Sequence, residues 1–564
     1  MTDFDTIIRN GTVVDGTGQV PGYRADVAIR NGKIAAIGAG IKGKATTELD
    51  ASGCIVAPGA VEIHGHYDHQ LPWDPYCTPT GWHGVTTVTI GTCGFGWAPC
   101  REEDRDAYVR LLSRVASIPP ASLSKWLPWD WETFPQYLDS VDKLPKGLNV
   151  ACMVPISPLR AYVMGAQEAC SRTELTDAEL QRMKALFREG MDAGAWGISL
   201  HRNPEDWRED GGPLPSMVAS QSEMLALAEI IREYNIGSVY WTGGVEDERE
   251  FVRNLCRASG RPMNWTGVIQ HKDEARDTWK SDLAWSEENL KLGLPMYAQA
   301  VPPVDMNFRL AECNLFDSIP AWKEPLLGTV EERIAKLKVP ATRQAMKTDL
   351  DEGRGFFHGE WDQIFVTKTV EERNRKYEGQ SVADIASAMG VHPVDAFLDL
   401  SIDEKLLTEF FEPHATGSND DATEALITAT STHPAVSDGG AHYRFLSGGH
   451  WPTYVLAKWT RDKGSVTLEQ AHYKLSALPA WIMGYRDRGI LREGMAADIM
   501  VYELDRLGFS KQSPRNDTPT GDLRQIRTAE GYRYTLVNGE VTFENGTCTG
   551  AVPGRLIRST EYTV

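Results

Sequence analysis

The stretch Val61-Glu62-Ile63-His64-Gly65-His66-Tyr67-Asp68-His69 follows the apolar run 54–59 and decides the predicted fold. In an extended strand, side chains two residues apart project from one face, so His64 and His66 can both offer an imidazole nitrogen to one metal ion. Asp68 continues this face and could orient a ligand histidine through a hydrogen bond. A solvated, exposed histidine cluster is the alternative interpretation, but the position directly after a strand favours a metal site.

The chain on either side of this stretch alternates between strand-like and helix-like segments. This alternation over some 400 residues predicts an α/β fold with a (β/α)8 TIM-like barrel over residues 59–487. Active sites of such barrels lie at the carboxyl ends of the strands, where His64 and His66 are expected. The predicted strands include 86–90, 150–154, 196–200, 238–241 and 268–270, and helices are predicted at 177–193 and 221–234.

Both ends of the chain have the pattern of short strands joined by tight turns. Asn10-Gly11, Asn31-Gly32 and Asn538-Gly539 stand between alternating runs, which is the strongest short-range hairpin signal. We therefore predict a small β-sandwich domain built from residues 1–58 and 488–564. Residues 273–379 are charged and less regular, and we interpret them as an excursion or lid over the barrel mouth.

The composition restricts the partners and the compartment. The 564 residues are 41% hydrophobic and carry a formal net charge of −20, so a nucleic acid or an anionic membrane is not expected as a partner. Nine cysteines without a CxxC pair, no basic leader and no long apolar run predict a cytoplasmic protein without a membrane span. A small-molecule substrate is expected, and a homo-oligomer is left open.

Five segments carry a resemblance to a known family. They resemble the N-acyl-D-amino-acid deacylases (D-aminoacylases) of the amidohydrolase superfamily, from the first hairpins to the last dozen residues. The resemblance implies the barrel with a small β-sandwich, and hydrolysis of an N-acylated D-amino acid. The segments are PGAVEIHGHYDHQ (58–70), GVTTVTIGTCGFGWAPC (84–100), VSDGGAH (436–442), DRGILREGMAADIMVYE (487–503) and VNGEVTFENGTCTGAVPGRLIRS (537–559).

The resemblance also implies a ligand set. It places His64, His66, Cys93, His271 and Asp438 at the positions of metal ligands, with Asp438 additionally handling the proton of the attacking water. A cysteine thiolate among imidazoles suits Zn²⁺, although other divalent transition metals remain open.

One position departs from the family pattern. Where the family carries a histidine after the fifth strand, this chain reads Tyr240-Trp241-Thr242-Gly243-Gly244, and Gly243 has no side chain to bind a metal. The fourth predicted strand ends in Ser199-Leu200-His201-Arg202, without the lysine that other amidohydrolases carbamylate. One zinc ion is therefore favoured over two.

The sequence predicts a metal-dependent hydrolase that cleaves an amide C–N bond with Asp438 as proton shuttle. Candidate substrate-binding residues are Arg160, Arg202, Trp241 and His442; the arginines could hold a carboxylate, and His442 could stabilise the oxyanion. The 17 tryptophans suggest a bulky aromatic amide. A lactonase, a cyclic-amide hydrolase or a lyase on the same scaffold is the alternative, and a non-catalytic scaffold is disfavoured by the joint presence of the ligand residues.

Overall fold

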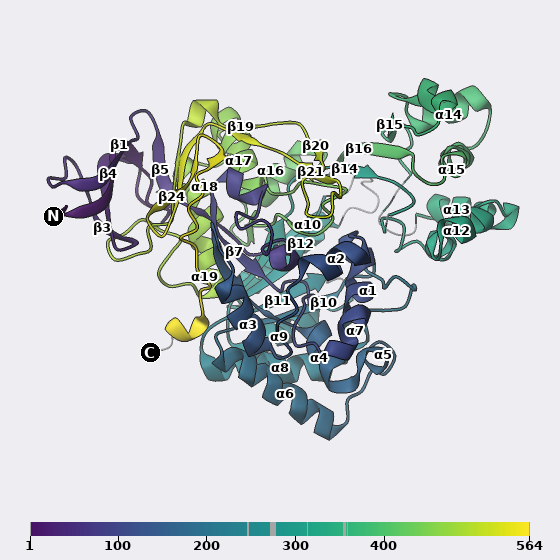
Figure 1. The fold of residues 1–564 in the computed structure, drawn as a ribbon, viewed down its shortest axis with the longest axis horizontal. Coiled ribbons are helices and arrows are strands. Elements are labelled where there is room, and N and C mark those ends of the chain that lie inside the picture. Colours follow the sequence, from purple (N-terminus) through teal and green to yellow (C-terminus); the bar gives the residue numbers. More distant parts are fainter. Residues whose placement is uncertain are drawn as a thin grey trace.

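Parallel strands followed by helices form the central part of the computed structural model, which describes residues 2–244, 247–270, 278–312, 314–353, 357 and 359–562 (Figure 1). A three-stranded parallel sheet contains β6 (Ala60–Glu62), β7 (Val85–Ile90) and β8 (Asn149–Cys152). Every residue of β7 is buried, as expected for a parallel strand covered on both faces. The predicted α/β class is confirmed.

A second, six-stranded parallel sheet continues this arrangement. A single residue separates β8 from the first strand of the six-stranded sheet. A parallel bridge joins Gly65, which follows β6, to Gly439, which follows the last strand of the six-stranded sheet. The carboxyl ends of β6 and of the strand that precedes Gly439 therefore lie side by side. In pairing order, its strands are β9 (Val154–Pro155), β10 (Gly197–Arg202), β11 (Ser238–Gly243), β12 (Met263–Val268), β13 (Met296–Ala300) and β17 (Thr432–His433).

Amphipathic helices cover these strands. The apolar face of α6 (Asp177–Asp192) is buried, and the helix begins at a capping box in which Thr176 and Glu179 satisfy each other's backbone N–H groups. Its neighbour α8 (Gln221–Tyr234) is capped by Ser220 at the start and by Asn235 at the end, and Asn235 adopts a left-handed conformation. The helices α9 (Arg249–Ser259) and α10 (Trp279–Lys291) follow β11 and β12 in the same way.

A nine-stranded sheet joins the two ends of the described chain. Its central strand β5 pairs in parallel with β1 and antiparallel with β18. At the turns Asn31-Gly32 and Asn538-Gly539, both residues have positive φ, as a two-residue hairpin turn requires. The strands are β1 (Phe4–Val13), β2 (Tyr23–Arg30), β3 (Lys33–Gly38), β4 (Ala45–Asp50), β5 (Ile55–Pro58), β18 (Ile499–Tyr502), β23 (Tyr532–Val537), β24 (Glu540–Glu544) and β25 (Thr547–Cys548).

The predicted turn at Asn10-Gly11 is wrong. Both residues lie inside β1, where the pairing with β2 shifts register between Ile8 and Gly11 and Asn10 has φ 62°. A Cβ on Gly11 would lie 2.4 Å from Val56 Cγ2, so the glycine permits close approach to β5. The Asn-Gly pair therefore marks a bulge rather than a chain reversal.

A separate unit follows β13 in the chain. The antiparallel sheet of β14 (Val304–Phe308), β16 (Glu409–Thr416) and β15 (Phe365–Lys368) packs with five helices around its own apolar cluster, and Figure 1 shows much of it at the end opposite β1, β3 and β4. The predicted excursion 273–379 differs, because it includes α10 and β13, which belong to the parallel arrangement, and ends before β16. The helices are α11 (Pro320–Lys323), α12 (Val330–Leu337), α13 (Pro340–Asp351), α14 (Val382–Met389) and α15 (Pro393–Asp403).

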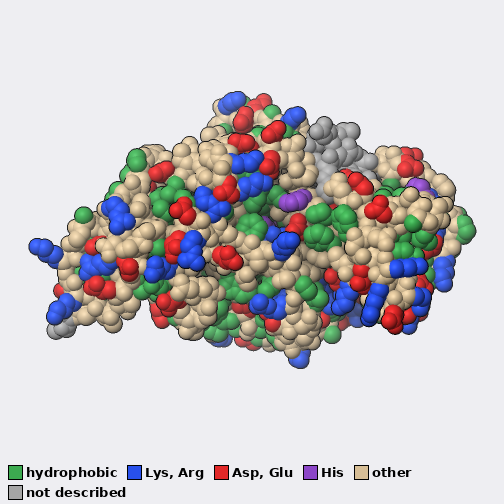
Figure 2. All heavy atoms as spheres, turned by 90° about the horizontal axis from the view of Figure 1, so that it is seen from above, with side chains coloured by type: hydrophobic (Ala, Val, Ile, Leu, Met, Phe, Trp, Pro, Cys, Tyr) green, Lys and Arg blue, Asp and Glu red, His purple; other side chains and the backbone are tan. Residues whose placement is uncertain are grey.

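The surface shown in Figure 2 mixes basic and acidic side chains without a large area of one sign. Within the described ranges, no helix combines the length and the apolar character that crossing a membrane would demand.

Candidate active site

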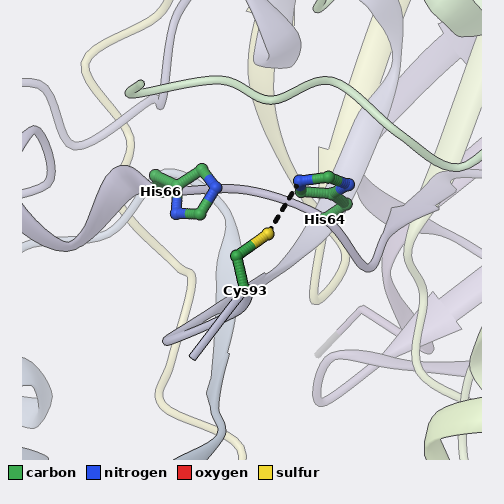
Figure 3. Close-up of side chains that lie close together, drawn as sticks. All are labelled: His64, His66 and Cys93. Carbon is green, nitrogen blue, oxygen red and sulfur yellow. Dashed lines mark hydrogen bonds between the residues drawn. The ribbon is translucent and has the colours of Figure 1, made fainter. Parts of the chain in front are cut away.

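Four donor atoms converge at the carboxyl ends of neighbouring parallel strands. Cys93 Sγ lies 3.2 Å from His64 Nε2, and Asp438 Oδ1 lies 3.2 Å from His66 Nε2 and 3.6 Å from His64 Nε2. The ligand atoms of His64, His66 and Cys93 all lie within 4.8 Å of one another, and Figure 3 shows the three side chains facing a common point. The structure thus brings four of the five predicted metal ligands together.

The local backbone explains this convergence. His64 and His66 follow β6, Cys93 follows β7, and Asp438 follows β17. The backbone N–H of His66 donates to Gly439 O at 2.6 Å, which ties the first segment to the last. Cys93 and Asp438 have φ values of 54° and 53°, a left-handed conformation that non-glycine residues rarely adopt and that concentrates at functional sites.

The electrostatics favour a thiolate and a carboxylate among positively charged rings. Burial opposes ionisation of the Cys93 thiol, but the adjacent His64 and His66 outweigh it, so the pKa of Cys93 lies well below its ordinary value. Burial also opposes protonation of His64, yet Cys93 and Asp438 raise the pKa of His64 to about 9. The pKa of Asp438 is lowered against the effect of burial, chiefly by His442, His66 and His64. This charge pattern is the one that a cation would stabilise in place of the ring protons.

The donor set suits a zinc ion. Donors at 2.0–2.3 Å from a tetrahedral ion lie roughly 3.3–3.8 Å apart. The separations of 3.2, 3.2 and 3.6 Å lie within this range or just below it. Two imidazoles, one thiolate and one carboxylate are also donor types that Zn²⁺ accepts.

A buried polar network holds His64 in place. Gln299 Oε1 accepts hydrogen bonds from His64 Nδ1 at 2.7 Å, Thr266 Oγ1 at 3.0 Å and Tyr240 Oη at 3.4 Å. Because the amide oxygen is an acceptor, His64 Nδ1 carries a proton, and Nε2 is the atom that would bind a metal ion. Tyr240 Oη also lies 4.0 Å from Cys93 Sγ. Neither Gln299 nor Tyr240 was among the predicted site residues.

The carboxyl groups of Glu62 and Asp68 lie near the cluster. Glu62 Oε1 accepts a hydrogen bond from the backbone N–H of His64 at 2.8 Å, and Glu62 Oε2 accepts one from Trp451 Nε1 at 2.8 Å. Burial raises the pKa of Glu62 to about 7. Asp68, predicted to orient a histidine, accepts instead from Tyr137 Oη at 3.1 Å and from the Gly91 N–H at 3.4 Å. In the described structure, Gln299 takes the orienting position that the sequence suggested for Asp68.

A largely apolar cavity of about 260 Å³ opens onto the cluster. Its walls include Phe95 and Trp97 after β7, Leu112 and Val115 of α1 (Arg105–Ala116), and Met306 of the separate unit. His442 and Asp438 line it as well, with His442 Nε2 3.7 Å from Asp438 Oδ2. The site therefore combines a cluster of candidate metal ligands with a largely apolar cavity, as substrate sites commonly do.

The model of the amidohydrolase family matches residues 47–543 of the chain. The chain belongs to the amidohydrolase family. D-aminoacylase of Alcaligenes xylosoxydans xylosoxydans is 27% identical over 564 residues, covering 99% of this chain and 98% of the relative. An uncharacterized protein of Mycobacterium tuberculosis is 28% identical over 575 residues, covering 96% of this chain and 92% of the relative.

A solved structure shares the fold of this amidohydrolase. N-acyl-D-glutamate deacylase from Bordetella bronchiseptica, in complex with zinc and a phosphonate inhibitor, superposes with a TM-score of 0.66 at 24% identity, covering 98% of this chain and 99% of the other. The resemblance to D-aminoacylases is confirmed, and the chain is a metal-dependent amidohydrolase, an enzyme acting on amide C–N bonds.

The two predicted carboxylate anchors of the amidohydrolase are engaged elsewhere. Arg160 is fully buried, pairs with Glu223 and donates to Ala169 O at 3.2 Å. Arg202 pairs with Glu248 and donates to Ala219 O at 2.5 Å. Neither is among the described residues that line the cavity, so their placement does not fit a substrate contact.

Trp241 also points away from the cavity. Its ring packs edge-on against Phe251 of α9 at 5.7 Å between centroids, whereas the adjacent Tyr240 faces the cluster. Residues two apart on a strand share a face, so Trp241 belongs to the helix-facing side of β11. The role predicted for Trp241 beside the substrate does not fit this placement.

Gly243 leaves no space for a ligand side chain. It has φ 138°, and a Cβ there would lie 2.6 Å from Arg202 O on the paired strand β10. The backbone at this position therefore does not accommodate the histidine of the family pattern without rearrangement. The remaining predicted ligand, His271, lies outside the described residues.

Proposed function

We propose that this amidohydrolase hydrolyses the amide bond of an N-acyl compound that carries a bulky apolar group, with one zinc ion held by His64, His66, Cys93 and Asp438. The observation that carries the proposal is the convergence of two Nε2 atoms, one Sγ and one Oδ1 at a largely apolar cavity. An N-acyl-D-amino acid is the substrate class suggested by the relatives at 24 to 27% identity.

The proposed chemistry requires few groups from the chain. A bound zinc ion supplies an activated nucleophile at neutral pH and polarises a carbonyl. The Asp438 carboxylate borders the cavity and is ionised, so it accepts a proton from the attacking water as the water oxygen bonds to the carbonyl carbon. Asp438 then delivers this proton to the leaving nitrogen as the C–N bond breaks. His442, 3.7 Å from Asp438, is placed to hydrogen-bond the developing oxyanion.

We further infer a (β/α)8 barrel and a small β-domain of residues 1–58 and 488–564. The short gap between β8 and β9 and the bridge between Gly65 and Gly439 support closure of the two parallel sheets into one barrel over 59–487. The nine-stranded sheet that contains β1–β5, β18 and β23–β25 supports the small domain. The unit from β14 to β16 supports a lid, because Met306 and Thr416 line the cavity.

Metal analysis and a substrate panel test the proposed function. We expect about one tightly bound equivalent of zinc and loss of activity in a chelator. A panel of N-acyl-D- and N-acyl-L-amino acids and aryl amides, assayed for amine release, would identify the amide class and the configuration. Less than about 0.2 equivalents of metal, with activity unaltered by chelator, would overturn the metal-dependent mechanism.

A further inference from the structure

The carboxyl group of Glu205 lies on the cavity wall and finds no hydrogen-bond or ion-pair partner in the described part of the chain. It belongs to the loop that follows β10 and is half-buried. Burial, and to a lesser extent Asp206, raise the pKa of Glu205 to about 8. A half-buried carboxyl group without a partner is poorly stabilised in its ionised form, and a ligand of opposite charge would stabilise it.

The nearby acid Asp206 is already satisfied. Its Oδ2 accepts from His201 Nε2 at 2.8 Å and from Asn203 Nδ2 at 3.0 Å. These two donors are therefore engaged by Asp206, and Glu205 remains available to a ligand.

The arginines around this loop are committed to other acids. Arg202 pairs with Glu248, and Arg208 pairs with Asp210 at 2.6 Å. On the adjacent helix α1, Arg114 holds Asp317 through two contacts of 2.6 Å. These cations neutralise other carboxylates rather than Glu205.

Apart from Cys93, the charged and titratable residues of the described cavity lining are four acids and four histidines, without a lysine or an arginine. Three of the histidines lie beside Asp438, which leaves Glu205 without a basic partner; the acids are Asp68, Glu205, Asp206 and Asp438, and the histidines are His64, His66, His69 and His442. A cation beside Glu205 would favour the ionised form of the carboxyl group and gain a charge-assisted hydrogen bond, whereas a substrate carboxylate would gain no such ion pair.

We propose that Glu205 binds a positively charged amine or guanidine group of the substrate, so that the cavity selects a cationic N-acyl compound with a bulky apolar part. This inference rests on the proposed function and makes it more specific. It departs from the amino-acid carboxylate that Arg160 and Arg202 were predicted to hold, because both arginines are engaged elsewhere.

Binding of three matched ketones to the metal-loaded enzyme tests the inference without turnover. In each ketone a methylene replaces the amide nitrogen, and the same scaffold carries an ammonium, a methyl or a carboxylate group. By calorimetry, we expect the ammonium compound to bind about 10- to 100-fold more tightly than the carboxylate compound. Glu205→Gln should remove this preference and leave the affinity for the methyl compound unchanged. Glu209→Gln, in an exposed acid of the same loop, serves as the matched control and should behave like the wild type.

The outcomes separate the two proposals. Tighter binding of the carboxylate compound, or an equal loss for all three compounds in Glu205→Gln, would overturn the role of Glu205. Failure of the wild type to hydrolyse the corresponding amides would instead count against the proposed function, because ligand binding does not depend on cleavage.

Discussion

Gln299 Oε1 lies 2.7 Å from His64 Nδ1, so a neutral amide rather than a carboxylate fixes the orientation of this imidazole. The same oxygen also accepts from Thr266 and Tyr240, which immobilises the amide. A carboxylate at this position would add a negative charge to a cluster that already contains Cys93 and Asp438. The amide therefore orients the ring without increasing the charge of the donor set.

Replacing Gln299 should weaken metal binding. Gln299→Leu removes the acceptor for His64 Nδ1, so we expect the dissociation constant for zinc to rise about 10- to 100-fold, measured by competition with a chromophoric chelator. Gln299→Glu keeps an acceptor oxygen and should retain most of the affinity. Equal zinc affinity in Gln299→Leu and the wild type would show that the amide has no orienting role.

Asp438→Asn should separate turnover from metal content. The asparagine cannot accept the proton of the attacking water, so we expect kcat to fall by about 10²- to 10⁴-fold. His64, His66 and Cys93 remain, and metal analysis should still find zinc in the purified variant. Turnover at the wild-type rate would refute the assignment of Asp438 as proton shuttle.

Cys93→Ser should lower the zinc content. Serine stays protonated at neutral pH and replaces a soft thiolate with a weak oxygen donor, so we expect zinc affinity to fall by at least about tenfold. Cys548→Ser is the control, because this thiol is exposed and lies on β25. Unchanged metal content in Cys93→Ser would make Cys93 a structural residue.

Arg160→Met should destabilise the fold rather than weaken substrate binding. It leaves the buried Glu223 carboxylate unpaired, and we expect the free energy of unfolding to fall by about 3–5 kcal/mol, measured by urea denaturation. Arg188→Met breaks the exposed pair with Glu233 and should cost about 0–1 kcal/mol. A rise in KM at unchanged stability would instead restore Arg160 as a substrate anchor.

Buried neutral histidines should make the fold sensitive to acid. Burial lowers the pKa of His83 to about 4 and of His472 to about 3. In the unfolded chain these rings titrate near 6.5, so the unfolded state binds more protons as the pH falls from about 7 to 4. Stability should therefore decrease over this window by up to about 1.4 kcal/mol per pH unit for each ring.

His472→Gln tests this origin of the acid sensitivity. It removes one titrating ring and should reduce the slope of unfolding free energy against pH between about 6 and 4. His414→Asn alters an exposed histidine and should leave the slope unchanged. An identical slope in His472→Gln and the wild type would assign the acid sensitivity to other groups.

The sequence identified the cluster but not its surroundings. His64, His66, Cys93 and Asp438 could be predicted because each follows an apolar strand or lies in a motif shared with the family. Gln299 could not, since a glutamine at the end of a strand has no distinctive pattern. Its importance depends on the approach of His64, which lies 235 positions away in the chain.

The sequence also did not show which face of a buried strand points towards the site. β11 is buried along its whole length, so no alternation of polar and apolar residues shows which side chains face the cluster. A shift of one residue exchanges the two faces, so the sequence did not show that Tyr240 faces the cluster while Trp241, expected at the substrate, faces α9. The ion pair of Arg160 could not be predicted either, because its partner Glu223 lies on α8, far along the chain.

The position of β5 has a consequence for synthesis on the ribosome. β5 comes early in the chain, just before β6 and the His64 segment. Its partner β18, in which Ile499 pairs with Pro58, is synthesised only after most of the chain. Until then one edge of β5 stays unpaired, and contacts of such long sequence separation form slowly. The nascent chain therefore carries His64 and His66 next to an unpaired strand edge, and we expect protection of that edge from other chains to be a condition for a productive yield of the enzyme.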